Sequence, residues 1–150
     1  MSRNEMIVQE AMIASSPQEI FEELLIWGEA NWWPKKSLMR FINLSGARKQ
    51  STVYLQKTKL PFGPAWHTRN EIVDSQNLRL KRIFLDGMFD GFEELTVAKS
   101  KDNAFKAIYA FNYHIKGLIN KIMWNLIFKR LHIKNIDLIL SSLKRYLEKG

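Results

Sequence analysis

The order of its segments constrains the fold of this chain more than any single motif does. An apolar segment over residues 6–13 precedes a helix start, about seventy residues of strand-like alternation follow, and an amphipathic stretch extends to the C-terminus. Strands that are joined by short turns and flanked by helices predict an α+β fold with an antiparallel sheet.

The first helix is signalled by the residues at its start. Ser16 suits the N-cap position, Pro17 suits the first helical position, and Glu19 completes a Ser-x-x-Glu capping box. A second short helix or turn over residues 29–33 must end before Pro34, because a residue before proline disfavours the helical conformation. We therefore expect two short helices after the first strand.

Six further strands are predicted by period-two alternation between clusters of turn-forming residues. They cover residues 38–44, 51–58, 65–73, 78–85, 88–97 and 104–115. After Gly117 an apolar stripe with helical spacing continues for about thirty residues, or roughly 45 Å, and only the sheet can cover it. The expected stripe consists of Leu118, Ile119, Ile122, Met123, Leu126, Ile133, Ile136, Leu140, Leu143 and Leu147, with Trp124 also in the core. No linker or repeat divides residues 1–150, so we expect a single domain.

Composition excludes some chemistry and leaves other partners open. The chain has no cysteine, which rules out disulfides and thiolate catalysis. Its net charge is +8, and residues 116–149 hold eight basic residues against Asp137 and Glu148. A basic helix either is a solvated face or binds an anionic membrane surface or an acidic partner. We expect no nucleic-acid binding, because no nucleic-acid motif is present.

The sequence also bears on location. The first ten residues contain no apolar region of signal-peptide length, so a cytoplasmic location is expected. The longest apolar stretch, residues 122–128, is far shorter than the roughly 20 residues that span a bilayer.

The opening over residues 6–27 is similar to the N-terminal signature of the polyketide cyclase/dehydrase-like group in the START/Bet v 1-like (SRPBCC) superfamily. Further similarities are the Leu60-Pro61-Phe62 loop before Trp66, the Asp90-Gly91 strand start, and the run Phe105, Ala107, Tyr109, Phe111, Tyr113. The resemblance covers essentially the whole chain. It implies a helix-grip fold, in which a seven-stranded antiparallel sheet wraps around the C-terminal helix. It also implies a cavity between them for a lipid, sterol, polyketide or hydroxylated ring compound.

Strand parity predicts which side chains face that cavity. The aromatic phase of residues 105–113 should point inward, which makes Tyr109 and Tyr113 candidate ligand contacts. The apolar phase of the preceding strand places Glu93 beside the cavity, where a carboxylate is unfavourable unless it is paired or protonated. Glu93 therefore has two possible roles. In the functional role it orients a ligand or acts as an acid or base, and in the structural role it is solvated or paired with an arginine.

Other candidates follow from weaker signals. We expect Trp66 and Asn70 inward on one strand and Tyr54 inward on its neighbour, whereas Trp33 either packs against the sheet or forms the cavity mouth. The three histidines, His67, His114 and His132, show no metal-ligand spacing, so each is expected to have a surface or supporting role. Nucleotide, nucleophile-elbow and zinc motifs are absent, and we expect no metal and no cofactor.

Three functions remain open at this point. The first is a carrier or sensor of a hydrophobic small molecule, in a cavity of roughly 300 to 1,000 Å³ that includes Trp66, Tyr109 and Tyr113. The second is a cyclase- or aromatase-type enzyme that uses Glu93 or a tyrosine for proton transfer. The third is a membrane-surface or protein interaction module that uses the basic helix. The sequence indicates neither the ligand nor the oligomeric state.

Overall fold

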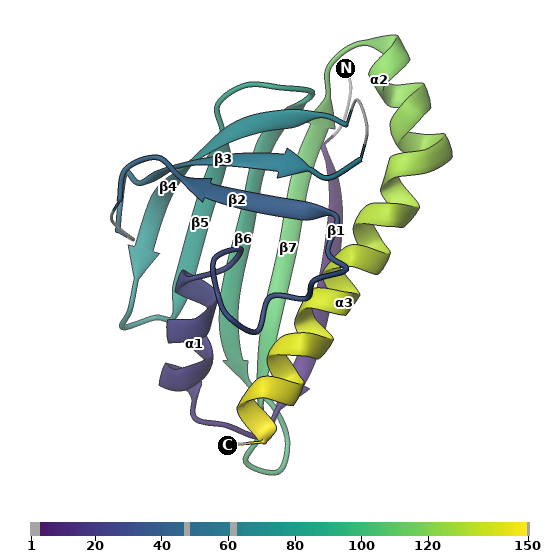
Figure 1. Ribbon diagram of the computed structural model, residues 1–150. Helices are drawn as coiled ribbons and strands as arrows, with labels where there is room; N and C mark the ends of the chain where they lie inside the picture. Colours follow the sequence, from purple (N-terminus) through teal and green to yellow (C-terminus); the bar gives the residue numbers. More distant parts are fainter. Residues whose placement is uncertain (1–3, 47–48, 61–62, 150) are drawn as a thin grey trace.

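One curved antiparallel sheet forms the body of the protein (Figure 1). The computed structural model describes residues 4–46, 49–60 and 63–149. The seven strands lie in the order β1-β7-β6-β5-β4-β3-β2, so each strand from β2 to β7 pairs with its neighbour in the chain, and β1 closes the sheet against β7. Their bounds are β1 Glu5–Ile13, β2 Met39–Asn43, β3 Val53–Thr58, β4 Ala65–Asp74, β5 Arg79–Phe84, β6 Phe89–Lys99 and β7 Phe105–Ile115. All seven predicted strands are confirmed.

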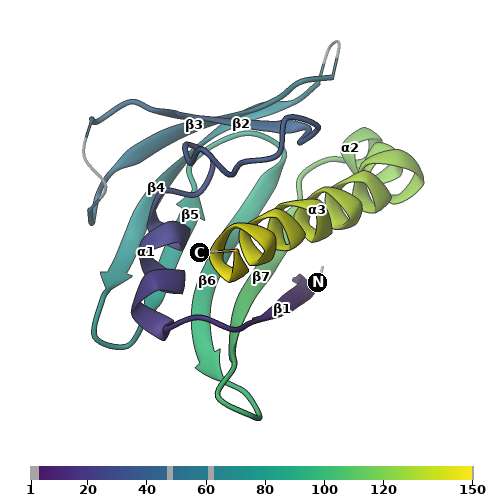
Figure 2. The ribbon, with the colours of Figure 1, turned by 60° about the horizontal axis from the view of Figure 1, so that its bottom comes forward.

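The C-terminal helix crosses the concave face of the sheet, as a helix-grip fold requires (Figure 2). It consists of α2 (Leu118–Met123), a π-helical turn η1 (Trp124–Phe128) and α3 (Lys129–Glu148) without a break. Helix α1 (Pro17–Leu25) packs against the sheet beside the other end of α3. Among the described residues, no helix is long and apolar enough to cross a membrane.

Helix α1 begins as the sequence predicts. Ser16 is the N-cap, and its Oγ accepts a hydrogen bond from the Glu19 amide at 3.2 Å. The Glu19 carboxylate accepts a hydrogen bond from the hydroxyl of Ser15 at 2.7 Å. The N-cap half of the predicted capping box is therefore present, while the Glu19 side chain bonds the hydroxyl of the preceding serine.

Residues 29–33, which were predicted as a second short helix or a turn, form turns, so only one of the two expected short helices is present there. Helix α1 ends at Leu25, with Ile26 as its C-cap. Gly28 follows with φ of +88°, and a side chain there would meet the Phe41 ring at 2.2 Å. The amides of Glu29 and Trp33 bond the carbonyls three residues earlier, at 2.9 and 3.1 Å. Pro34 follows at once, so these single turns have no room to grow into a helix.

The predicted stripe of the long helix is correct only in its second half. Ile136, Ile139, Leu140 and Leu143 of α3 are buried against the sheet. In contrast, α2 has no buried residue, and Trp124 is the only buried residue of η1. Five apolar side chains that were expected in the core are exposed: Leu118, Ile119, Ile122, Met123 and Leu126. No face of α2 is buried, so this part of the helix is not covered by the sheet.

Candidate functional site

Two small cavities lie between the sheet and the C-terminal helix. Their volumes are about 50 and about 30 Å³. Both are much smaller than the expected range of roughly 300 to 1,000 Å³, so the prediction of a large open pocket is wrong. The two cavities share five wall residues: Met39, Trp66, Phe89, Trp124 and His132.

Aromatic rings fill the space in which a larger pocket was expected. Phe89 is central, and its ring centroid lies 5.1 Å from those of Trp66, Phe111 and Trp124. Trp27 stacks on Tyr109 with centroids 5.9 Å apart and planes at 9°. Strand parity predicted the inward aromatic phase of β7 correctly, but it did not predict that these rings pack against one another.

Glu93 is the centre of a buried polar network at the smaller cavity. Its side chain is 4% exposed. One carboxylate oxygen accepts hydrogen bonds from Gln56 Nε2 at 2.7 Å and from Arg82 Nε at 2.9 Å, and the other accepts from the Tyr109 hydroxyl at 2.9 Å. Burial, together with the nearby Glu93 carboxylate, holds the pKa of Tyr109 well above its usual value, so this hydroxyl stays protonated and donates.

Arg82 pairs with Glu93 and is itself 1% exposed. Its guanidinium carbon lies 5.2 Å from the Phe41 ring centroid and 5.8 Å from that of Tyr54, while Nη1 and Nη2 have no hydrogen-bond partner. Of the two roles left open for Glu93, the structure shows the arginine pairing. A catalytic role for Glu93 stays a prediction and would need proton movement within this network.

Three of the seven predicted ligand contacts line a cavity. Trp66 borders both cavities, and Glu93 and Tyr109 border the smaller one. The Trp66 indole nitrogen donates to Gln56 Oε1 at 2.9 Å, which ties the cavity wall to the Glu93 network. These three side chains come from β4, β6 and β7, so the curvature of the sheet brings them together.

The other four predicted contacts lie outside both cavity walls. Tyr54 is buried beside Arg82, and Asn70 donates to the Lys49 carbonyl at 3.0 Å. Tyr113 donates to Glu5 at 2.6 Å and accepts a hydrogen bond from the Trp124 indole nitrogen at 3.0 Å. Trp33 donates to the Met39 carbonyl at 3.1 Å and packs on Trp27, as its packing alternative predicted. A ligand-binding role for these four remains a prediction.

His132, which was predicted to have a surface or a supporting role, is partly buried among aromatic side chains. Its ring lies 5.0 Å from that of Phe111 and 5.7 Å from that of Trp124. Although part of the residue reaches solvent, Nε2 is buried without a hydrogen-bond partner, and burial lowers the pKa of His132 to about 4. The imidazole is therefore neutral at neutral pH. His67 does lie at the surface, where Nδ1 is 2.8 Å from Asp86.

Asn135 is a second site residue that the sequence did not single out. It is 5% exposed, and its Oδ1 accepts a hydrogen bond from the Leu38 amide at 2.9 Å, while Nδ2 has no partner. Asn135 and His132 both line the larger cavity, three residues apart on α3. Their i, i+3 spacing within the inward stripe was the signal that could have identified them.

The π turn aligns the helix side of the larger cavity. Trp124, Phe128 and His132 follow one another at intervals of four and all line this cavity. A π turn contains more residues than an α turn, so side chains four residues apart point in more nearly the same direction than they do in an α-helix. Within the described ranges, no group of three or more His, Cys, Asp or Glu side chains could hold a metal ion.

Comparison with solved structures places the fold among Bet v 1-like proteins. TTHA0849 from Thermus thermophilus superposes with a TM-score of 0.73 at 15% identity, covering 97% of this chain and 98% of that one. Norcoclaurine synthase from Thalictrum flavum, in complex with dopamine and hydroxybenzaldehyde, gives 0.71 at 13% identity, covering 98% and 88%. Ara h 8.0201 gives 0.65 at 12% identity, covering 98% and 99%. No family model matches the chain, and no curated protein gives a significant match. At these identities the likeness shows the fold alone.

Proposed function

We propose that the protein binds a small, mainly apolar molecule that carries one hydrogen-bonding group, in the larger cavity between sheet and helix. One observation carries the proposal. Among the described residues, the wall is apolar except at Thr58, His132 and Asn135, and His132 Nε2 and Asn135 Nδ2 are buried without a hydrogen-bond partner. A buried polar group without a partner costs about 1–3 kcal/mol, which a ligand group of matching chemistry recovers.

The chemistry of the two atoms selects a hydroxyl or carbonyl group on the ligand. Asn135 Nδ2 is a donor, because Oδ1 of the same amide already accepts from the Leu38 amide. His132 Nε2 belongs to a neutral ring, so it either donates or accepts according to its tautomer. A hydroxyl oxygen accepts from Asn135 while its proton remains free for His132. A charged group is disfavoured, since no charged side chain lines this cavity.

The volume limits the size of the ligand and requires movement on binding. A cavity of about 50 Å³ is smaller than the roughly 150 Å³ that accommodates benzene in an engineered protein interior. The wall must therefore widen, and it is weakest at the helix start, where Trp124 is the only buried anchor of residues 118–128. A small phenol fits this picture better than a sterol or a long polyketide does.

The comparisons with solved structures are compatible with this ligand class and do not identify the ligand. A protein of the same fold holds dopamine and hydroxybenzaldehyde, which are phenolic ring compounds. We propose binding rather than catalysis, because both oxygens of Glu93 are engaged by neighbouring donors. His132 is moreover the only titratable side chain among the described residues that line the larger cavity.

The test compares a phenol with an apolar compound of the same shape. Isothermal titration with p-cresol and p-xylene should give saturable binding of both, with p-cresol tighter. His132→Leu should weaken p-cresol binding about tenfold, the scale of one hydrogen bond, and leave p-xylene nearly unchanged. His67→Leu is the matched control and should change neither. An absence of saturable binding for both compounds would overturn the proposed function, and an equal effect of His132→Leu on both would remove the polar contact from it.

A further inference from the structure

The start of the C-terminal helix carries an exposed apolar face that the proposed ligand site does not use. Six side chains form two parallel i, i+4 rows on its outer side, and they are 37–77% exposed. We call this the outer face; its rows are Leu118-Ile122-Leu126 and Ile119-Met123-Ile127. Trp124 and Phe128 belong to the opposite row, which faces the cavity. This helix segment is therefore apolar on two sides, and only one side is covered.

The helix segment that carries the outer face has basic residues and no acidic residue of its own. Residues 116–136 contain five basic residues and no acidic residue. Lys116 and Lys129 lie near Asp90 and Glu5, at 3.5 and 3.6 Å. The other three, Lys121, Arg130 and Lys134, form no ion pair with any residue that the structure describes. Lys116 thus precedes the apolar rows in the chain, Lys121 lies within their span, and Lys129 and Arg130 follow them.

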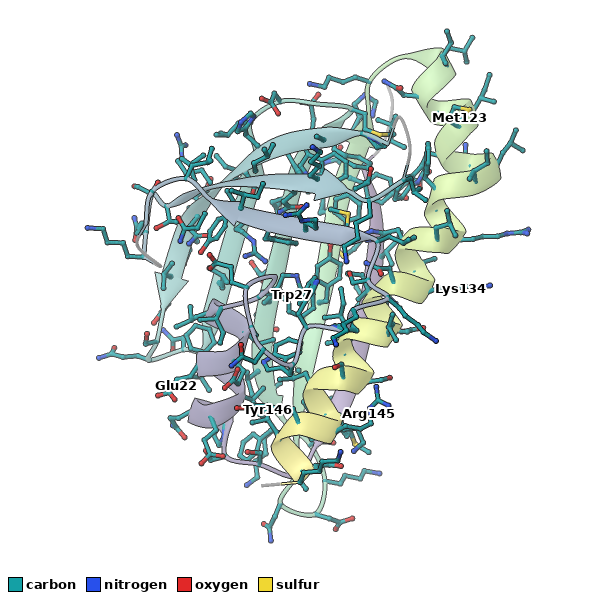
Figure 3. All side chains as sticks on the ribbon, viewed as in Figure 1. Glu22, Trp27, Met123, Lys134, Arg145 and Tyr146 are labelled. Atoms are coloured by element: carbon teal, nitrogen blue, oxygen red, sulfur yellow. The ribbon has the colours of Figure 1, made fainter. Side chains whose placement is uncertain are left out.

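We propose that the outer face docks on an anionic lipid bilayer. An amphipathic helix that lies in a membrane surface combines buried apolar side chains with basic residues at headgroup level, and the outer face has both features. The segment is convex and lies at one end of the molecule, as the position of α2 and of the labelled Met123 shows (Figures 1 and 3). A fluid lipid surface can accommodate a convex helix without a preformed groove.

Charge argues against a second copy of the chain as the occupant. Pairing two outer faces would bring Lys121 and Arg130 of both copies together, and residues 116–136 supply no carboxylate to pair with them. A bilayer that contains phosphatidylglycerol supplies the missing negative charge. Docking would also place the helix segment that walls the larger cavity at the lipid surface, with Phe128 on the opposite side of the helix, towards the cavity. The docking proposal stands on exposure and charge, and does not depend on the ligand proposal.

Vesicle co-sedimentation tests the proposal directly. We expect binding to vesicles of phosphatidylcholine with 30% phosphatidylglycerol, at least tenfold weaker binding to pure phosphatidylcholine, and a marked loss of binding in high salt. The double variant Ile119→Gln/Leu126→Gln should reduce binding to anionic vesicles at least tenfold. Val8→Gln/Met12→Gln is the control, because it removes two apolar side chains of β1 that are more than half exposed, and it should bind like the unchanged protein.

Site-specific labelling locates the contact, and the absence of native cysteines makes the labelling unambiguous. An environment-sensitive nitrobenzoxadiazole label at Ile119→Cys should shift to the blue on addition of anionic vesicles, and one at Val8→Cys should not. Equal binding of the Ile119→Gln/Leu126→Gln variant would overturn the proposal. So would a shift at both labels, or self-association through the outer face with no vesicle binding.

Discussion

At the scale of single residues, the most consequential feature is the ion pair between Glu93 and Arg82. Both side chains are almost fully buried, and the pair is joined at 2.9 Å. A buried pair contributes little net stability compared with apolar residues, but removing one partner leaves an uncompensated charge. The same two strands, β5 and β6, also carry a more exposed pair at 2.8 Å between Arg79 and Glu94. The two pairs provide an internal comparison.

We predict that Glu93→Gln lowers the free energy of unfolding by about 3–5 kcal/mol, because Arg82 remains buried without its counter-ion. The double variant Glu93→Gln/Arg82→Met should lose less than the sum of the two single variants. Glu94→Gln is the control and should lose no more than about 1 kcal/mol, since its pair is more exposed. Urea denaturation measures the stability of the three single variants and the double variant. Similar losses for Glu93→Gln and Glu94→Gln would contradict the claim that burial makes the Glu93–Arg82 pair the more costly one to break.

His132 supplies a second prediction at this scale. Burial lowers its pKa in the folded protein to about 4, below its usual value of about 6.5 in an unfolded chain. Between these two values the unfolded state binds more protons, so stability falls as the pH falls. The contribution of His132 is complete above about pH 6.5 and is lost towards pH 4, with a size of up to about 3 kcal/mol.

The measurement is the unfolding free energy of the protein and of His132→Phe between pH 7 and pH 4. The unfolding free energy of the unchanged protein, relative to that of His132→Phe, should fall as the pH falls, because the phenyl ring cannot be protonated. The control variant His67→Phe removes a surface histidine and should keep the His132 contribution. If the stability curve of His132→Phe runs parallel to that of the unchanged protein, the imidazole is not desolvated.

At the scale of elements, the sequence predicted the strands well because each has a period-two pattern between turn clusters. The predicted bounds of 104–115 and the observed β7, Phe105–Ile115, differ by one residue. The inward phases of β4 and β6 were also correct, since Trp66 and Glu93 are buried. The similarity at Leu60-Pro61-Phe62 falls partly on Pro61 and Phe62, which lie outside the described residues.

The helices were harder to predict because their faces depend on where the sheet ends. Apolar spacing alone suggested one inward stripe from Leu118 onward, but the π turn at Trp124–Phe128 changes the phase of the helix. No residue type signals a π turn in a single sequence. For the same reason the place of His132 in the cavity wall was not predicted, because its surroundings in the sequence are mainly basic. Its role depends on the helix rotation that places it beside Trp124.

At the scale of the whole molecule, the two ends of the helix differ in how firmly they are held. Near α1, Ile139, Leu140 and Leu143 are buried. At the other end Trp124 alone is buried in residues 118–128, its indole donates to Tyr113, and both cavities adjoin it. Both the proposed ligand site and the proposed outer face therefore depend on the loosely held end. The sheet and α3 form a rigid frame for it.

This asymmetry predicts an uneven pattern of amide hydrogen exchange. Local opening is favoured where few apolar side chains are buried, so amides of Trp124–Phe128 should be at least tenfold less protected than those of residues 136–143. Exchange measured by NMR at several low denaturant concentrations separates local opening from global unfolding, because only global unfolding exposes enough surface to depend strongly on denaturant. Trp124→Leu should lower protection further in residues 118–128 and leave that of β6 and β7 nearly unchanged. Equal protection along the whole helix would show that Trp124 is a sufficient anchor, and that ligand entry must occur elsewhere.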